Sequence, residues 1–119
     1  MDIKPYLTPN KYGKPVIESS GIAGSFDSRA VDCPTVFRHK DAFYMMYIGF
    51  DGIGYQTGLA RSQDLFNWEK LGCILKRGSD CEWDKVGRAG TWILRDCDLY
   101  GSHELLKIDG KYWLFYHSY

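Results

Sequence analysis

Hydrophobic residues fall into runs separated by short polar or glycine-containing turns. The runs predict strands over residues 30–39, 42–50, 55–62 and 68–76. Between them lie a tight turn at 40–41, an Asp-Gly turn at 51–54 and a longer polar turn near 63–67. Each strand follows the previous one after a short connection, so the four are expected to form an antiparallel meander. No stretch of the chain carries a good helical period.

The second run, "AFYMMYIGF" at 42–50, is apolar at almost every position. A strand with one face in water alternates between apolar and polar residues, whereas a strand buried on both faces does not. This run therefore predicts a strand that is covered on both faces.

The remaining segments give weaker signals. Residues 1–30 read as loop, with a short strand expected at 14–18, and Pro34 marks the first long strand as an edge strand or a strand start. Residues 77–101 are irregular apart from an expected strand at 91–96. Residues 102–119 read as strand, turn at Asp109-Gly110, and strand.

An internal repeat joins the two halves of the chain. Phe43–Tyr47 aligns with Tyr112–Tyr116 at an offset of 69 residues, and the turn at 40–41 then aligns with the turn at 109–110. Repeated four-stranded meanders are typical of β-propellers. We therefore predict an all-β fold in which 1–119 is the N-terminal part of a propeller domain. Blade one covers about 30–76 and blade two starts at about 102–119.

The propeller is expected to be incomplete in this chain, because fewer than two repeats fit into 119 residues. The exposed blade edges would then pair with the remaining blades or with another copy of the chain. The alternative is a two-sheet β domain that contains a duplicated hairpin.

The composition of the chain argues against some classes of binding partner. Fifteen basic and fifteen acidic residues give a net charge of zero, which argues against nucleic acid and against a membrane surface. No run approaches the ~18 apolar residues of a membrane span, and the N-terminus has no apolar signal core. A cytoplasmic location is expected, and a secreted or periplasmic one stays open if a leader is missing.

The four cysteines show neither a Cys-x-x-Cys pair nor a histidine at zinc spacing. Free, buried thiols are expected, with one disulfide between Cys73 or Cys81 and a neighbour as the alternative. No metal site and no cofactor are predicted.

Three stretches carry a family resemblance: "FDSRAVDCPTVF", "FYMMYIGFDG" and "GLARSQDLFNWEKLG". They resemble the opening blade of the five-bladed β-propeller glycosidases, the grouping of glycoside hydrolase families 43, 32 and 130 that includes mannoside phosphorylases. The resemblance implies a central funnel lined by acidic residues from successive blades. It also implies a carbohydrate substrate whose glycosidic bond is cleaved.

Glycosidic cleavage uses two carboxyl groups that flank the bond. Asp32 and Glu104, from the first strand of each expected blade, are the catalytic candidates, and Asp27 competes with Asp32. The family pattern has the aspartate directly before the proline, whereas Cys33 intervenes here. That shift turns Asp32 to the other face of an ideal strand, and a β-bulge at Pro34 would restore its direction.

Four further residues are candidates for substrate binding. Arg29 suits phosphate or a neutralising contact with the acids, Asp51 and Gln56 suit sugar hydroxyls, and His103 lies beside Glu104. Alternatively, Asp51 has only the structural role of forming its Asp-Gly turn, and Asp27 has only that of capping a turn.

The leading functional hypothesis is therefore a glycoside hydrolase that works by carboxylate acid/base catalysis. A glycoside phosphorylase of the same fold and a non-catalytic carbohydrate-binding propeller are the alternatives.

Overall fold

The computed structural model describes residues 2–4 and 11–118, and the elements in this part of the chain are all strands. They are β1 (Ala30–His39), β2 (Ala42–Phe50), β3 (Tyr55–Ser62), β4 (Glu69–Leu75), β5 (Ala89–Ile93), β6 (Lys107–Ile108), β7 (Lys111–Tyr112) and β8 (Leu114–His117). Within the described residues, no helix is long and apolar enough to cross a bilayer.

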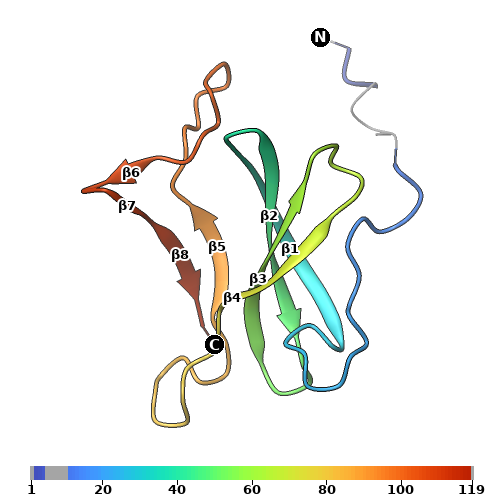
Figure 1. Cartoon of the computed structure of the whole chain (residues 1–119), viewed down its shortest axis with the longest axis vertical. Helices are drawn as coiled ribbons and strands as arrows, with labels where there is room; N and C mark the ends of the chain where they lie inside the picture. Colours follow the sequence, from blue (N-terminus) through green and yellow to red (C-terminus); the bar gives the residue numbers. More distant parts are fainter. Residues whose placement is uncertain (1, 5–10, 119) are drawn as a thin grey trace.

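The first four strands form one antiparallel sheet in the order β1-β2-β3-β4 (Figure 1). β1, β2 and β3 have the predicted bounds, and β4 starts one residue later and ends one residue earlier than predicted. The sheet is open, with β1 and β4 as its edges. The predicted all-β class and the four-stranded meander are confirmed, and the open sheet is consistent with an incomplete propeller.

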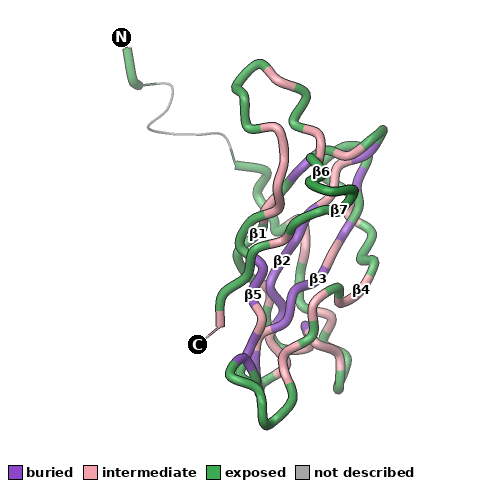
Figure 2. Tube along the Cα trace, turned by 90° about the vertical axis from the view of Figure 1, so that its left-hand side faces the viewer, coloured by how far each residue is buried: buried purple, intermediate pink, exposed green. Residues whose placement is uncertain are grey.

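β2 is buried over most of its length, as its apolar sequence predicts (Figure 2). On one face, Met45 and Tyr47 form a core cluster with Ala60 of β3. The N-terminal segment covers this face, and the Phe26 ring lies so close to Gly49 and Gly58 that a Cβ at either would come within 2.6 Å of it. Glycine is needed at these two positions because an aromatic ring occupies the space of their side chains.

The other face of β2 is covered by the segment that contains β5. Met46 and Leu59 of the sheet line an apolar cavity of about 220 Å³ together with Ile93 and Leu105. The contact is fixed by Thr57, whose buried hydroxyl donates to the Arg88 carbonyl at 2.8 Å and accepts from the Gly90 amide at 2.7 Å.

The second half of the chain forms smaller sheets. β5 pairs with β8, and β6 pairs with β7 around the predicted turn at Asp109-Gly110. The repeat is visible in this turn, because Lys40 and Asp109, 69 positions apart, have nearly equal positive φ values of 53° and 52°. The assignment of the two halves to successive blades stays a prediction.

Two strand predictions are wrong. Residues 14–18 form bends instead of a strand, and Val16 and Ile17 pack against the core cluster. The strand expected over 102–108 shrinks to Lys107–Ile108, and residues 104–106 pair with 94–96 through an isolated bridge between Arg95 and Leu105.

Replacing Thr57 by valine should lower the free energy of unfolding by about 1–3 kcal/mol, because it leaves a buried carbonyl and a buried amide without their partner. The matched control is Thr91→Val, since Thr91 is exposed and its hydroxyl contacts only the Phe115 carbonyl, at 3.2 Å. Urea unfolding of both variants measures the difference. Equal losses would show that Thr57 does not hold β5 on the sheet.

Candidate functional site

The first sheet has two ends that carry different groups. The Asp51 end holds the start of β1, the β2–β3 turn at 51–54 and the β4–β5 connection at 76–88, all at the bottom of Figure 1. The Lys40 end holds the β1–β2 turn and the β3–β4 turn. The connection joins the Asp51 end through Tyr55, whose amide donates to the Val86 carbonyl at 3.0 Å.

A β-bulge sets the direction of Asp32. Asp32 lies opposite Ile48 and Thr35 lies opposite Met46, so Cys33 and Pro34 together face a single residue of β2. Cys33 takes the extra turn with a φ of +47°. Because the side-chain period of a strand is two, the extra residue brings Asp32 to the same face as Thr35. The bulge that would restore the direction of Asp32 is thus present, and this face is the one toward β5.

The carboxylate of Asp32 is exposed and little used by the protein. One oxygen accepts a hydrogen bond from the Cys33 amide at 2.6 Å, and the Cys33 thiol is a second hydrogen-bonding neighbour of the carboxylate. Asp32 is therefore a carboxylate that can still accept hydrogen bonds from a ligand.

Arg29 lies three residues before Asp32 beside a polar hollow. The hollow has a volume of about 370 Å³ and is lined by Gly21, Ala23, Gly24, Ser28, Arg29 and Asp51. The Arg29 amide donates to the Phe50 carbonyl at 2.9 Å, which anchors its backbone. Among the described residues no carboxylate pairs with its guanidinium, so Arg29 brings an uncompensated positive charge to the hollow.

Asp51, in contrast, is saturated by the protein. Its carboxylate accepts from the Ile53 and Gly54 amides at 2.8 and 3.0 Å, from Gln56 at 3.3 Å and from Arg77. Burial raises its pKa, but the hydrogen bonds from Arg77 and from the backbone outweigh burial, and the net pKa is lowered. The expected contacts of Asp51 and Gln56 with sugar hydroxyls would compete with these bonds.

Asp27 lies in a buried cluster on the opposite face of the sheet. Its carboxylate accepts from Lys70 and Ser25, both at 2.6 Å, and from the Tyr47 hydroxyl at 3.4 Å. Burial raises its pKa, and the hydrogen bonds from Lys70 and Ser25 lower it further than burial raises it. This arrangement ties the N-terminal segment to β4, and it accounts for Asp27 as a structural group.

Glu104 lies at the other end of the sheet from Asp32. It accepts a hydrogen bond from the Lys40 amide at 3.0 Å and lies 3.4 Å from His39 Nδ1. Lys40 is eight positions after Asp32 along β1, and because the bulge takes up one of them the span is about 23 Å. The expectation that Asp32 and Glu104 share one hollow is wrong for the described chain, because the connection through β5 carries Glu104 to the Lys40 end.

His103 is also at the Lys40 end. It is exposed, has a φ of +56°, and lines a groove of about 440 Å³ with Phe37 and Arg95. It therefore lies away from the hollow beside Arg29.

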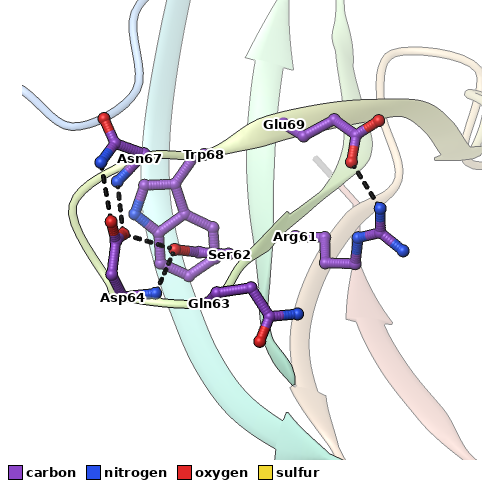
Figure 3. A pocket seen from close by; sticks show the side chains of 7 residues that line it. All are labelled: Arg61, Ser62, Gln63, Asp64, Asn67, Trp68 and Glu69. Atoms are coloured by element: carbon purple, nitrogen blue, oxygen red, sulfur yellow. Dashed lines mark hydrogen bonds and ion pairs between the residues drawn. The ribbon is translucent and has the colours of Figure 1, made fainter. Parts of the chain in front are cut away.

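The β3–β4 turn encloses a further hollow of about 410 Å³ (Figure 3). There the Asp64 carboxylate accepts from the amides of Phe66 and Asn67 at 2.8 and 2.7 Å, and these bonds hold its pKa low. The Trp68 indole donates to the Leu65 carbonyl at 2.9 Å. These polar groups serve the turn itself, and we assign the hollow no ligand.

Sequence reasoning missed the basic residues that neutralise the acids. Arg77 pairs with Asp51, Lys70 with Asp27, and Arg88 with Asp84. Lys70 and Arg77 are distant in sequence from the acids that they neutralise, and Arg88 lies in the irregular 77–88 segment. Only Lys70 could have been singled out from the sequence, because it is a charged residue in a largely apolar strand.

The structure also bears on the state of the cysteines and on the arrangement of possible metal ligands. Cys33, Cys73, Cys81 and Cys97 are all free, as predicted, but the prediction that they are buried is wrong, because Cys73 is part-buried and the other three are exposed. Among the described residues no group of three or more His, Cys, Asp or Glu side chains is arranged to hold a metal ion.

Comparison with known proteins places the fold among glycoside hydrolases. No protein-family profile matches the chain, and no curated protein matches it significantly. The solved structure of a BT0996 complex with RGII matches with a TM-score of 0.67 and 33% identity over 86% of this chain and 32% of that one. A second, "Glycoside hydrolase", matches with a TM-score of 0.67 and 32% identity over 85% and 30%.

The chain thus spans about a third of the length of the solved structures that it matches. The matches support a glycosidase-like fold and a glycosidase-like or carbohydrate-binding role.

Replacing Asp27 by asparagine should lower the free energy of unfolding at pH 7 by about 2–3 kcal/mol. This is less than the about 3–5 kcal/mol of a fully buried pair, because Lys70 is partly exposed. The folded-state pKa lies below the ordinary 3.8, so the stabilisation is present above pH 3.8 and is lost as the pH falls through the folded pKa. Urea unfolding of both proteins between pH 7 and pH 2 should show their stabilities converging at the acid end. A constant difference across this range would contradict the assignment.

Proposed function

We propose that the chain is part of a glycoside-cleaving β-propeller and that its carbohydrate binds at the Asp51 end. Two observations support the proposal from outside the site. The neighbour fold is that of a glycoside hydrolase, and one neighbour is named with RGII, a carbohydrate. The zero net charge gives no support to a polyanionic partner.

The proposal depends mainly on a contrast at this end between charged side chains that are paired within the protein and charged side chains that are not. Asp51 is neutralised by Arg77, whereas Arg29 and Asp32 have no ion-pair partner among the described residues. Paired charges stabilise the fold, and unpaired charges are available to a ligand. Arg29 lines the hollow, whereas Asp32 lies outside its lining, on the face of the sheet toward β5.

In the proposed reaction Asp32 supplies one of the two carboxyl groups, as base or as stabiliser of the positive charge that develops on the sugar. The second group must lie about 5 Å away for retention, or about 6.5–9.5 Å away for inversion. Glu104 is too distant to be that group within the described chain. The partner therefore comes from further blades or from a second copy.

Exposed apolar side chains support such an assembly. Trp113 and Phe115, on and beside β8, are about half exposed, and β8 pairs only with β5 in the described chain. An open edge with apolar faces favours association with another sheet.

Phosphorolysis is the second candidate, and Arg29 favours it. Its uncompensated guanidinium beside the hollow is suited to inorganic phosphate as the acceptor in place of water, or to the carboxylate of an acidic sugar. Addition of phosphate to a cleavage assay separates the two reactions, since only a phosphorylase releases a sugar phosphate.

Asp32→Asn in the assembled propeller should lower kcat by about 10²–10⁴-fold, the range of a positioned acid or base, while oligosaccharide binding persists. Turnover and calorimetric binding measured on the same preparation separate the two effects. The matched control is Asp41→Asn, an exposed aspartate in the β1–β2 turn at the Lys40 end, which should leave both unchanged. Full turnover by the Asp32 variant would remove Asp32 from the reaction.

The isolated 119-residue chain should bind oligosaccharides without cleaving them, because Asp32 lies at the Asp51 end whereas Glu104, the other catalytic candidate, is held at the Lys40 end. Incubation of the purified chain with labelled oligosaccharides, followed by product analysis, tests this. Cleavage by the monomer would show that the second catalytic group lies inside the chain.

A further inference from the structure

The β4–β5 connection holds an exposed tryptophan on a well-bonded loop. Trp83 is 71% exposed, the largest exposed fraction of any described tryptophan. The loop beneath it is closed by backbone hydrogen bonds from Gly78 and Gly87 to the Asp84 carbonyl at 3.1 and 3.2 Å. The Glu82 amide donates to the Ser79 carbonyl at 2.9 Å. The indole therefore stands on a defined backbone and not on a loose tip.

A buried charge cluster supports the ring from behind. The Asp84 carboxylate is buried and accepts from Arg88 through both Nε and Nη2, and from the Tyr116 hydroxyl at 2.9 Å. These bonds fix the Tyr116 ring, on which Trp83 stacks with centroids 6.0 Å apart and planes inclined by 16°. One face of the indole is thus backed by protein and the other faces solvent.

The surroundings of the ring are polar and carry charges of both signs. Glu82, about half exposed, accepts from Arg88 Nη2 at 3.3 Å. The 76–88 connection holds four basic and three acidic residues, and Arg77 is paired with Asp51 outside it. Among the described groups none accepts a hydrogen bond from the Trp83 indole N–H, which leaves a donor at the edge of the ring.

We propose that Trp83 is a stacking platform for a neutral sugar ring. A rigid aromatic face offers apolar contact to the C–H face of a sugar at low entropic cost, and the neighbouring indole N–H and Glu82 provide polar contacts for its hydroxyls. The inference rests on the proposed carbohydrate function and adds a subsite for it at the Asp51 end, where the same connection abuts Gly54.

The test is the binding of neutral oligosaccharides, arabinotetraose and xylotetraose, to the 119-residue chain, measured by calorimetry and by tryptophan fluorescence. Trp83→Ala should weaken binding by about tenfold or more, which corresponds to about 1.4 kcal/mol. Trp113→Ala is the matched control, because Trp113 is also an exposed tryptophan of the second half, and it should bind as the wild type does. In the wild type, bound sugar should protect one tryptophan from acrylamide quenching, and Trp83→Ala should lose that protection.

Trp83→Phe keeps a smaller ring and should show an intermediate loss, which provides a second measurement if the alanine variant unfolds. Calorimetric binding that is equal in the wild type and both Trp83 variants would overturn the platform while leaving the carbohydrate function intact. No calorimetric binding of any of these sugars, or of tetragalacturonic acid, to the wild type would overturn both.

Discussion

The structure depends on the covering of β2 from both sides. Its sequence leaves no polar face, so each side must be closed by another segment. Phe26 closes one side because Gly49 and Gly58 leave room for its ring. The segment of β5 closes the other, and the hydroxyl of Thr57 satisfies the buried amide and carbonyl groups that this contact brings to the sheet.

The contact of the β5 segment with the sheet also determines where the charged side chains lie. Once residues 86–88 lie beside Tyr55, the preceding loop must sit at the Asp51 end, where Arg77 reaches Asp51 and where Trp83 is held by Asp84. The continuation past β5 then runs to the opposite end, which carries Glu104 to Lys40. A single docking event thus determines which acids can cooperate and which cannot.

The sequence was informative where local signals were strong. The apolar run of β2, the Asp-Gly turn at 51–52 and the proline at 34 predicted a buried strand, a hairpin and an edge strand, all of which are present. It failed for Glu104 because a 69-residue offset says nothing about the path of the intervening chain. The partners of Asp27 and Asp51 were also beyond reach, since Lys70 and Arg77 meet them only through long-range packing.

Whether a carboxylate is paired within the protein distinguishes structural from candidate catalytic acids more clearly than its position in a sequence motif does. Asp27 and Asp51 both lie near the start of β1 or the β2–β3 turn, yet each is held by a basic side chain and several hydrogen bonds, and protonating or moving either would cost stability. A group in that state is a poor catalyst, because the reaction would have to break the contacts that hold the fold. Asp32 is placed by a bulge instead of by partners, so its carboxylate can change its hydrogen bonds during a reaction without weakening the sheet.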